Sequence, residues 1–193
     1  MTPVPTVRCF IAINLAADVR DAVAAATAPL RAAAPGEAWI PPERLHITVR
    51  FLGEQDAAFV ERLAVGVAGA ARRYEPIPLE LQGIGAFPTF RRARVIWVGV
   101  GYDPKLELLH HDVEVACMAL GLEVEGRPFR PHVTLARLVA PGGDVARAIR
   151  TATRGVRVHA SSMVDSIDIM ASEPAPHGRT YVRLAALPLG RAR

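Results

Sequence analysis

The sequence predicts an α+β fold built from largely antiparallel sheets. Its predicted strands come in runs as well as alternating with helices, a pattern that argues against a doubly wound parallel sheet. The 193 residues are 51% hydrophobic and 22% charged, which is an ordinary composition for one compact domain or two small packed lobes. A short motif occurs twice, about half a chain apart, and such a repeat suggests a duplicated lobe.

The first two strands are each predicted to be followed by a helix. A buried strand is expected over Val7–Leu15 and a helix over Ala17–Ala33. Leu45–Leu52 alternates apolar and polar residues, as a half-buried strand does. Asp56 has a side chain suited to a helix N-cap, so a second helix is expected from there to about Tyr74.

The middle of the chain is predicted to form two strands and a long helix. Ile77–Ile84 alternates as a strand, and Val95–Val100 is rich in β-branched residues. Between them, Gly83–Arg94 is the most loop-like internal stretch. Asp103 is expected to cap a helix that ends near Leu120, just before a glycine.

The C-terminal third is predicted to contain four strands and one short helix. The strands are expected over Pro131–Leu138, Val156–His159, Val164–Ala171 and Thr180–Ala186. The helix is expected over Val145–Ala152. No shift in composition marks a linker between independent domains.

The repeated motif is His-x-Thr near the start of a predicted strand. It reads HITVRFL from His46 and HVTLARL from His132, with three of seven positions identical. Side chains on a strand alternate between two faces. The apolar face of the first copy is therefore expected to hold Leu45, Ile47, Val49 and Phe51, and the polar face His46, Thr48 and Arg50. In the second copy, His132 and Thr134 share a face.

Two imidazoles and two hydroxyls that face each other across a cleft suit the chemistry of a phosphodiester. A neutral histidine can take a proton from water, and a protonated one can give a proton to the leaving oxygen. The hydroxyls of Thr48 and Thr134 can donate hydrogen bonds to the non-bridging oxygens, where charge builds. Neither motif has a second ligand at metal spacing, and no glycine-rich phosphate loop is present. The sequence therefore predicts catalysis by His46 and His132 without a metal or another cofactor.

Both motifs resemble those of a known family. HITVRFLG (46–53) and FRPHVTLARL (129–138) are similar to the motifs of the 2H phosphoesterase superfamily, specifically the RNA 2′,3′-cyclic phosphodiesterases, also called 2′–5′ RNA ligases. The resemblance implies one bilobal domain over residues 1–193, with two pseudo-symmetric lobes, each an antiparallel sheet with outer helices, around a central cleft. It also implies ATP-independent hydrolysis of a 2′,3′-cyclic phosphate to a 2′-phosphate, with reversible 2′–5′ joining of RNA ends.

The resemblance also implies roles for individual residues. It makes His46 the general acid at O3′ and His132 the base that activates water. Arg137 matches the family arginine that supports the phosphate after the second motif. In a straight strand Arg137 would face the core, so the strand must bulge, end near Leu135, or let the long side chain wrap round. Arg50 is the alternative phosphate ligand, because it is expected to share a face with His46.

The stretch between the third and fourth predicted strands is a candidate RNA contact. Its aromatic and arginine side chains could stack on bases and pair with phosphates. These candidates are Phe87, Phe90, Arg91, Arg92 and Arg94. The net charge of +4 and the pI of about 9.7 permit a polyanionic partner without demanding one.

The expected partner is RNA with a 2′,3′-cyclic phosphate end, and tRNA-like fragments are candidates. The N-terminus lacks a signal-peptide pattern, and no apolar run is long enough to span a membrane. A cytoplasmic monomer is therefore expected. The remaining histidines and the two cysteines are expected to be structural or solvated; they are His110, His111, His159, His177, Cys9 and Cys117.

Two other functions fit the same motifs. A cyclic phosphodiesterase that acts on a small nucleotide would use the same chemistry in a smaller pocket. A non-catalytic module that binds RNA ends would use the histidines and threonines only to hold phosphate. A turnover assay separates this module from either enzyme.

Overall fold

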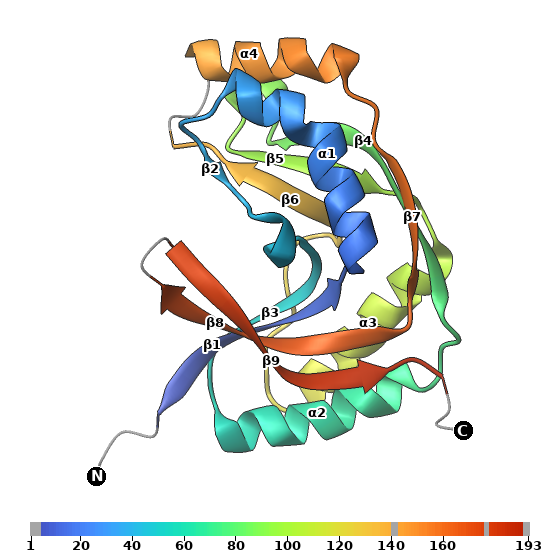
Figure 1. Cartoon of the computed structure of the whole chain (residues 1–193). Coiled ribbons are helices and arrows are strands. Elements are labelled where there is room, and N and C mark those ends of the chain that lie inside the picture. The colour runs from blue at the N-terminus through green and yellow to red at the C-terminus, as the bar shows by residue number, and fades with distance from the viewer. Residues whose placement is uncertain (1–4, 140–142, 176–177, 191–193) are drawn as a thin grey trace.

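The computed structural model describes residues 5–139, 143–175 and 178–190, which form a curled antiparallel sheet flanked by helices (Figure 1). The strands are β1 (Thr6–Asn14), β2 (Ala38–Trp39), β3 (His46–Asp56), β4 (Ile77–Phe87), β5 (Val95–Val100), β6 (His132–Arg137), β7 (His159–Val164), β8 (Ser166–Ala175) and β9 (Gly178–Pro188). The helices are α1 (Ala17–Ala33), α2 (Ala57–Ala71), α3 (Pro104–Ala119) and α4 (Gly143–Ala152). The predicted α+β class is confirmed.

The sheet consists of two lobes that meet between β3 and β6. The strand order is β7-β4-β5-β6-β3-β1-β8-β9, with β2 paired on β6. β3 and β6 pair at one position, Ile47 opposite Val133, whereas β1 and β3 pair along most of their length. The first lobe, with β1, β3, β8 and β9, carries α2 and α3, and the second lobe, with β2 and β4 to β7, carries α1 and α4 (Figure 1). Two pseudo-symmetric lobes with outer helices were predicted, and the structure has them.

Both predicted helix caps are present. Asp56 accepts a hydrogen bond of 2.7 Å from the amide of Phe59 at the start of α2. Asp103 accepts one of 2.7 Å from the amide of Lys105 at the start of α3. Each cap satisfies an amide that the first turn of a helix leaves without a partner. The two helices that begin at these caps pack against each other beneath the first lobe (Figure 1).

A continuous apolar core lies between the sheet and the helices. Ile11 and Ile47 of the sheet and Leu63 of α2 are fully buried in it. Neighbours along a strand face opposite sides, so Phe10 points away from this core into a smaller cluster that Tyr181 joins. The candidate active site is built on that second face of the sheet.

Two predicted boundaries are wrong for identifiable reasons. The strand expected over Val156–His159 starts only at His159, where pairing with β4 begins. Val156 is buried ahead of that pairing, so its apolar character reflects packing rather than a strand. The stretch Gly83–Arg94 is only partly a loop, because a bulge at Gly83, with φ of 70°, lets β4 continue to Phe87.

The remaining expectations concern residues away from the junction. Cys9 and Cys117 are buried free thiols, and His111 and His159 are exposed, as predicted. His177 lies outside the described residues. Among the residues that the structure describes, no helix combines the length and apolar character needed to cross a membrane.

Candidate active site

The two His-x-Thr motifs meet where the lobes join. β3 and β6 run antiparallel, and the buried side chains of Ile47 and Val133 lie opposite each other. One residue to either side, the same register brings each histidine opposite the threonine of the other strand: His46 with Thr134, and His132 with Thr48. Because strand side chains alternate, all four polar groups lie on the face away from the core. The site therefore has an approximate two-fold axis through the Ile47–Val133 pair.

Each motif is followed by a β-bulge at the same position. On β3, Val49 is an extra residue between two positions paired with β1. On β6, Leu135 is an extra residue between two positions paired with β5. A bulge places two consecutive side chains on one side and reverses the alternation beyond it. The side chains that follow each bulge therefore lie on the faces opposite to those predicted for a straight strand.

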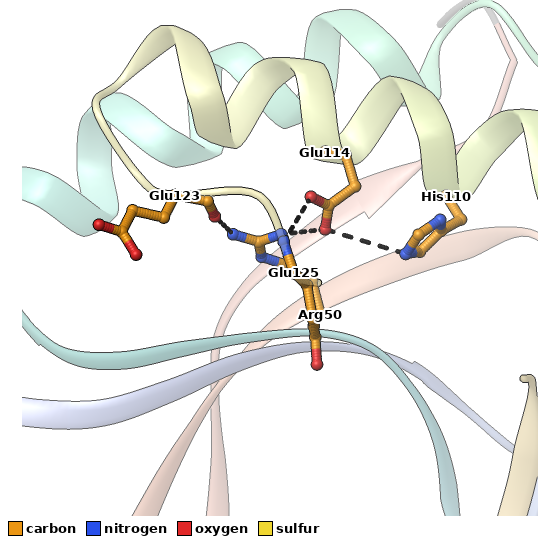
Figure 2. A network of polar contacts seen from close by, with 5 residues as sticks. All are labelled: Arg50, His110, Glu114, Glu123 and Glu125. Carbon is orange, nitrogen blue, oxygen red and sulfur yellow. Dashed lines mark hydrogen bonds and ion pairs between the residues drawn. The ribbon is translucent and has the colours of Figure 1, made fainter. Parts of the chain in front are cut away.

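The bulge at Val49 overturns two predictions for the first motif. Arg50, expected beside His46, is 4% exposed and points under α3 (Figure 2). There it forms an ion pair with Glu114 and donates a hydrogen bond to the carbonyl of Glu123 (Figure 2). The suggestion that Arg50 supports the phosphate is therefore wrong.

The same bulge brings an unexpected residue into the cleft. Phe51, predicted for the core, is 52% exposed and lines the cleft next to Thr48. On the second strand, the bulge at Leu135 places Arg137 on the cleft side. Of the three arrangements that the sequence allowed for Arg137, the structure therefore has the bulged strand. Phe51 and Arg137 occupy equivalent positions after the two bulges, so one motif supplies an aromatic ring and the other a cation.

The polar face of the junction opens into a cavity of about 300 Å³. His46, Thr48 and Thr134 line it. Its other charged groups are four arginines: Arg8, Arg44, Arg137 and Arg179. No carboxylate is found among the described residues that line this cavity. Such a lining attracts an anion.

His46 is held by its backbone and by two aromatic rings. Its Nδ1 lies 2.8 Å from the carbonyl oxygen of Arg44, so Nδ1 carries a proton and donates it there. Its Nε2 lies 3.2 Å from the hydroxyl of Thr48. The rings of Phe10 and Tyr181 have centroids 5.1 and 5.2 Å from the imidazole. These contacts orient the ring and leave Nε2 on the side of the Thr48 hydroxyl.

His132 is held in the same way. Its Nδ1 lies 2.6 Å from the carbonyl oxygen of Arg130, again two residues earlier in the chain. Phe87 meets the imidazole edge-on, with a centroid distance of 5.0 Å, and the ring of Trp97 lies at 6.2 Å. The second motif therefore repeats the tautomer and the aromatic surroundings of the first.

Burial lowers the pKa of both imidazoles from the ordinary value of 6.5. For His46, the charges of His132 and Arg137 lower the pKa further, and the bond to the Arg44 carbonyl opposes the shift. For His132, Arg137 acts in the same direction after burial, and the bond to the Arg130 carbonyl opposes it. In the free protein both histidines therefore favour the neutral form near pH 7. A bound anion would raise both pKa values.

A second cavity, of about 460 Å³, adjoins the first at Thr48 and Phe51. His132 and Phe87 line it on the side of the second lobe. Phe129 lines it too, and its ring stacks on His110 with centroids 4.1 Å apart. His110 lies 3.9 Å from Glu114, so it connects this cavity to the buried Arg50 pair (Figure 2). From the sequence, His110 was expected to be only structural or solvated, and Phe129 was noted only as the first residue of the second motif.

The candidate RNA-contact residues are not brought together. Phe87 lies beside His132. Phe90 and Arg91 line a separate groove against α4, with Arg147 and Arg150. The two others, Arg92 and Arg94, are exposed and line none of these three cavities.

The donor set does not resemble a metal centre. Within residues 5–139, 143–175 and 178–190, no three histidine, cysteine, aspartate or glutamate side chains are grouped so that they could hold an ion. The first cavity is lined by one imidazole, by hydroxyls and by four guanidiniums, and the guanidiniums suit an anion rather than a cation.

A curled antiparallel sheet that joins two His-x-Thr strands on one face defines a two-histidine phosphoesterase. The chain belongs to the 2′-5′ RNA ligase superfamily, whose family model matches residues 19–174. This confirms the family resemblance of the two motifs.

Individual relatives extend the similarity beyond the motifs. An RNA 2′,3′-cyclic phosphodiesterase of Geobacillus stearothermophilus is 34% identical over 128 residues, which are 66% of this chain and 41% of that protein. One of Methanothermobacter thermautotrophicus is 29% identical over 184 residues, 95% of this chain and 99% of that protein. The crystal structure of TT0787 of Thermus thermophilus matches with a TM-score of 0.80 at 28% identity, covering 96% of this chain and 100% of that one.

Proposed function

We propose that this protein hydrolyses 2′,3′-cyclic phosphate ends of RNA to 2′-phosphates, using His46 and His132 without a metal. The observation that carries the proposal is the antiparallel junction at Ile47 and Val133, which gathers both histidines and both threonines on one face. The arginine-lined cavity on that face suits a phosphate. The names of the relatives support RNA with a cyclic phosphate as the substrate.

In this mechanism the cyclic phosphate lies between the two Nε2 atoms. Nε2 of His132 takes a proton from water as the water oxygen attacks phosphorus. The phosphorus–O3′ bond breaks, and O3′ takes the proton from Nε2 of His46. The products are a 2′-phosphate and a 3′-hydroxyl, and a proton exchanged with solvent returns the two histidines to their starting states. The anionic substrate favours this start, because its charge raises the lowered pKa of His46.

The neighbouring donors stabilise the charge that develops on the phosphate. Thr48 and Thr134 face it from opposite strands, and each can donate one hydrogen bond to a non-bridging oxygen. Arg137, on the cleft side of the bulge, adds a fixed cation. If the 5′-hydroxyl of a second RNA end replaces water, the same steps give a 2′–5′ linkage, and ligation is therefore part of the proposal.

The remaining expectations stay predictions from the sequence: a cytoplasmic location, a monomeric state and tRNA-like fragments among the substrates. So do the two alternative functions. Turnover assays distinguish both alternatives from the proposal. An enzyme for small nucleotides would catalyse the same chemistry on a smaller substrate, and a non-catalytic RNA-end module would form no product.

The direct test uses a short oligoribonucleotide that ends in a 2′,3′-cyclic phosphate, incubated with the purified protein and excess EDTA. We expect complete conversion to the 2′-phosphate isomer at the same rate with and without the chelator. A 3′-phosphate product would contradict the assignment of O3′ as the leaving group. Loss of activity in EDTA, restored by a defined divalent ion, would contradict the metal-free mechanism, and binding without product would identify the non-catalytic module.

A further inference from the structure

The cleft is symmetric at the histidines but not beyond them. On the His46 side, Arg8, Arg44 and Arg179 join Arg137 in the lining. On the His132 side, the lining of the adjoining cavity is mostly apolar, and its arginines, Arg127 and Arg130, are accompanied by the carboxylate of Glu125. The four motif residues and Arg137 suffice to surround one phosphate, so the additional arginines beside His46 need a separate explanation.

Arg179 is held in place rather than left free in solvent. Its Nε donates to the hydroxyl of Ser172 at 2.6 Å, and its Nη2 donates to the Ser172 carbonyl at 2.5 Å. Ser172 is buried on the neighbouring strand β8. Two of the three guanidinium nitrogens are thus fixed by one residue, while the group still lines the cavity. An arginine anchored in this way presents its charge at a defined place and loses little entropy when it binds an anion.

Arg44 connects this arginine to the catalytic histidine. Its guanidinium donates to the carbonyl of Arg179 and lies 5.9 Å from the centre of the Tyr181 ring. The carbonyl of Arg44 accepts the Nδ1 hydrogen bond of His46, and Tyr181 meets the same imidazole edge-on. The β8–β9 hairpin is therefore linked to His46 through Arg44 and Tyr181.

The third arginine, Arg8, lies on β1, the strand next to this hairpin. Arg8 of β1 pairs with Ser172 of β8, which in turn pairs with Tyr181 of β9. Within the described part of the chain, Arg8, Arg44 and Arg179 form no ion pair with a carboxylate. Three cations gathered without a counter-charge repel one another, and an anionic ligand relieves that repulsion.

We propose that Arg179, Arg44 and Arg8 form a second phosphate subsite, for the phosphodiester one nucleotide upstream of the reacting end. The inference rests on the proposed function and specifies its substrate class. In RNA, the terminal nucleoside joins the cyclic phosphate through O2′ and O3′ and the next phosphate through O5′. With the cyclic phosphate between the histidines, the upstream phosphate lies over the first lobe, and the site selects oligonucleotide ends over mononucleotides.

The test compares two substrates that differ by one phosphodiester. One is a nucleoside 2′,3′-cyclic phosphate, and the other is a dinucleotide that ends in the same cyclic nucleotide. We expect the wild-type kcat/KM to be higher for the dinucleotide by about tenfold or more, as for one or two charge-assisted hydrogen bonds. In Arg179→Gln the ratio of the two values should fall towards one. Arg62→Gln, which removes an exposed arginine from α2, should keep the wild-type ratio.

A third substrate separates charge from size. A dinucleotide with an uncharged methylphosphonate linkage should behave like the mononucleotide in the wild-type protein. If the uncharged dinucleotide keeps the advantage, or if Arg179→Gln keeps the wild-type ratio, the phosphate subsite is wrong while the proposed function stands. If neither cyclic phosphate is turned over, the proposed function itself fails. Far-ultraviolet circular dichroism of each variant shows that the fold is retained.

Discussion

The two motifs of this cleft match each other at their histidines and threonines and differ in the residues that follow. Each supplies a histidine whose Nδ1 donates to the carbonyl two residues earlier, and each histidine packs against two aromatic rings. Each motif also ends in a bulge at the same position. The proposed reaction takes one proton and gives one, so it makes equal demands on the two strands and would account for their similarity.

The difference begins just after the bulges. The first motif continues with Arg50, buried against Glu114, and then Phe51 in the cleft. The second continues with Ala136, buried without a polar partner to satisfy, and then Arg137 in the cleft. The two strands thus place histidine and threonine alike, whereas the residues beyond them line the two sides of the cleft differently. In the proposed mechanism, two matching histidines therefore act within a cleft whose two sides differ.

The largest expected effect tests whether the two histidines are equally necessary. His46→Ala and His132→Ala should each lower kcat by about 10²–10⁴-fold, because an acid or a base contributes that much. Thr48→Ala and Thr134→Ala should lose less, since each removes one neutral donor among several. Single-turnover assays on the cyclic-phosphate oligonucleotide measure these losses. His159→Ala, which removes an exposed histidine at the start of β7, is the control. A rate within about threefold of wild type for either histidine variant, with the fold intact, would contradict the claim that both histidines are necessary.

The next effect concerns the contribution of the Arg50–Glu114 pair, which lies in the first lobe, to the stability of the fold. Glu114→Ala leaves the buried guanidinium of Arg50 without its ion pair, and we expect a loss of about 3–5 kcal/mol in the free energy of unfolding. Urea unfolding measures it. Asp144→Ala, which removes the exposed partner of Arg147 on α4, should change stability little. The double variant Arg50→Met/Glu114→Leu should recover part of the loss. If Glu114→Ala is no more destabilising than Asp144→Ala, the buried pair does not support the first lobe.

Local chemistry explains why much of the fold could be predicted. Asp56 and Asp103 have side chains that cap helices, and α1 was predicted with its observed bounds, Ala17–Ala33. The site could be found as well, because His-x-Thr occurs on two alternating strands and nothing else in the chain repeats in this way. These signals depend only on residues that are close in sequence, so they can be recognised without knowledge of tertiary contacts.

The misplaced side chains of the two motifs have one common cause. A bulge depends on the register of the partner strand, which the local sequence does not specify. Strict alternation therefore misplaced Arg50 and Phe51, and it left the side of Arg137 open. The subsite arginines were missed for a related reason: Arg179 reaches the cleft only through pairing of β8 with β9. Nothing near Arg179 in the sequence indicates that Arg44 lies beside it.

The smallest expected effect is a shift in pH dependence, and Arg137 is the residue that tests it. Arg137 belongs to one motif, yet its charge lowers the pKa of both His46 and His132. A cation disfavours a second positive charge nearby, so its removal lets both imidazoles hold protons to higher pH. In Arg137→Gln, the bell-shaped profile of kcat/KM, which reports the free enzyme, should therefore move to higher pH.

The substrate should act on the wild-type protein in the same direction. A bound cyclic phosphate places an anion between the histidines, which raises both pKa values, so the kcat profile should lie at higher pH than the kcat/KM profile. The two limbs belong to the coupled pair rather than to either histidine. Rates measured across the pH range with the mononucleotide substrate avoid any contribution from the upstream phosphate. A kcat/KM profile that stays in place or moves to lower pH in Arg137→Gln would mean that this arginine does not influence the histidines electrostatically. Arg137, which only the second motif has, would then serve only to bind the phosphate.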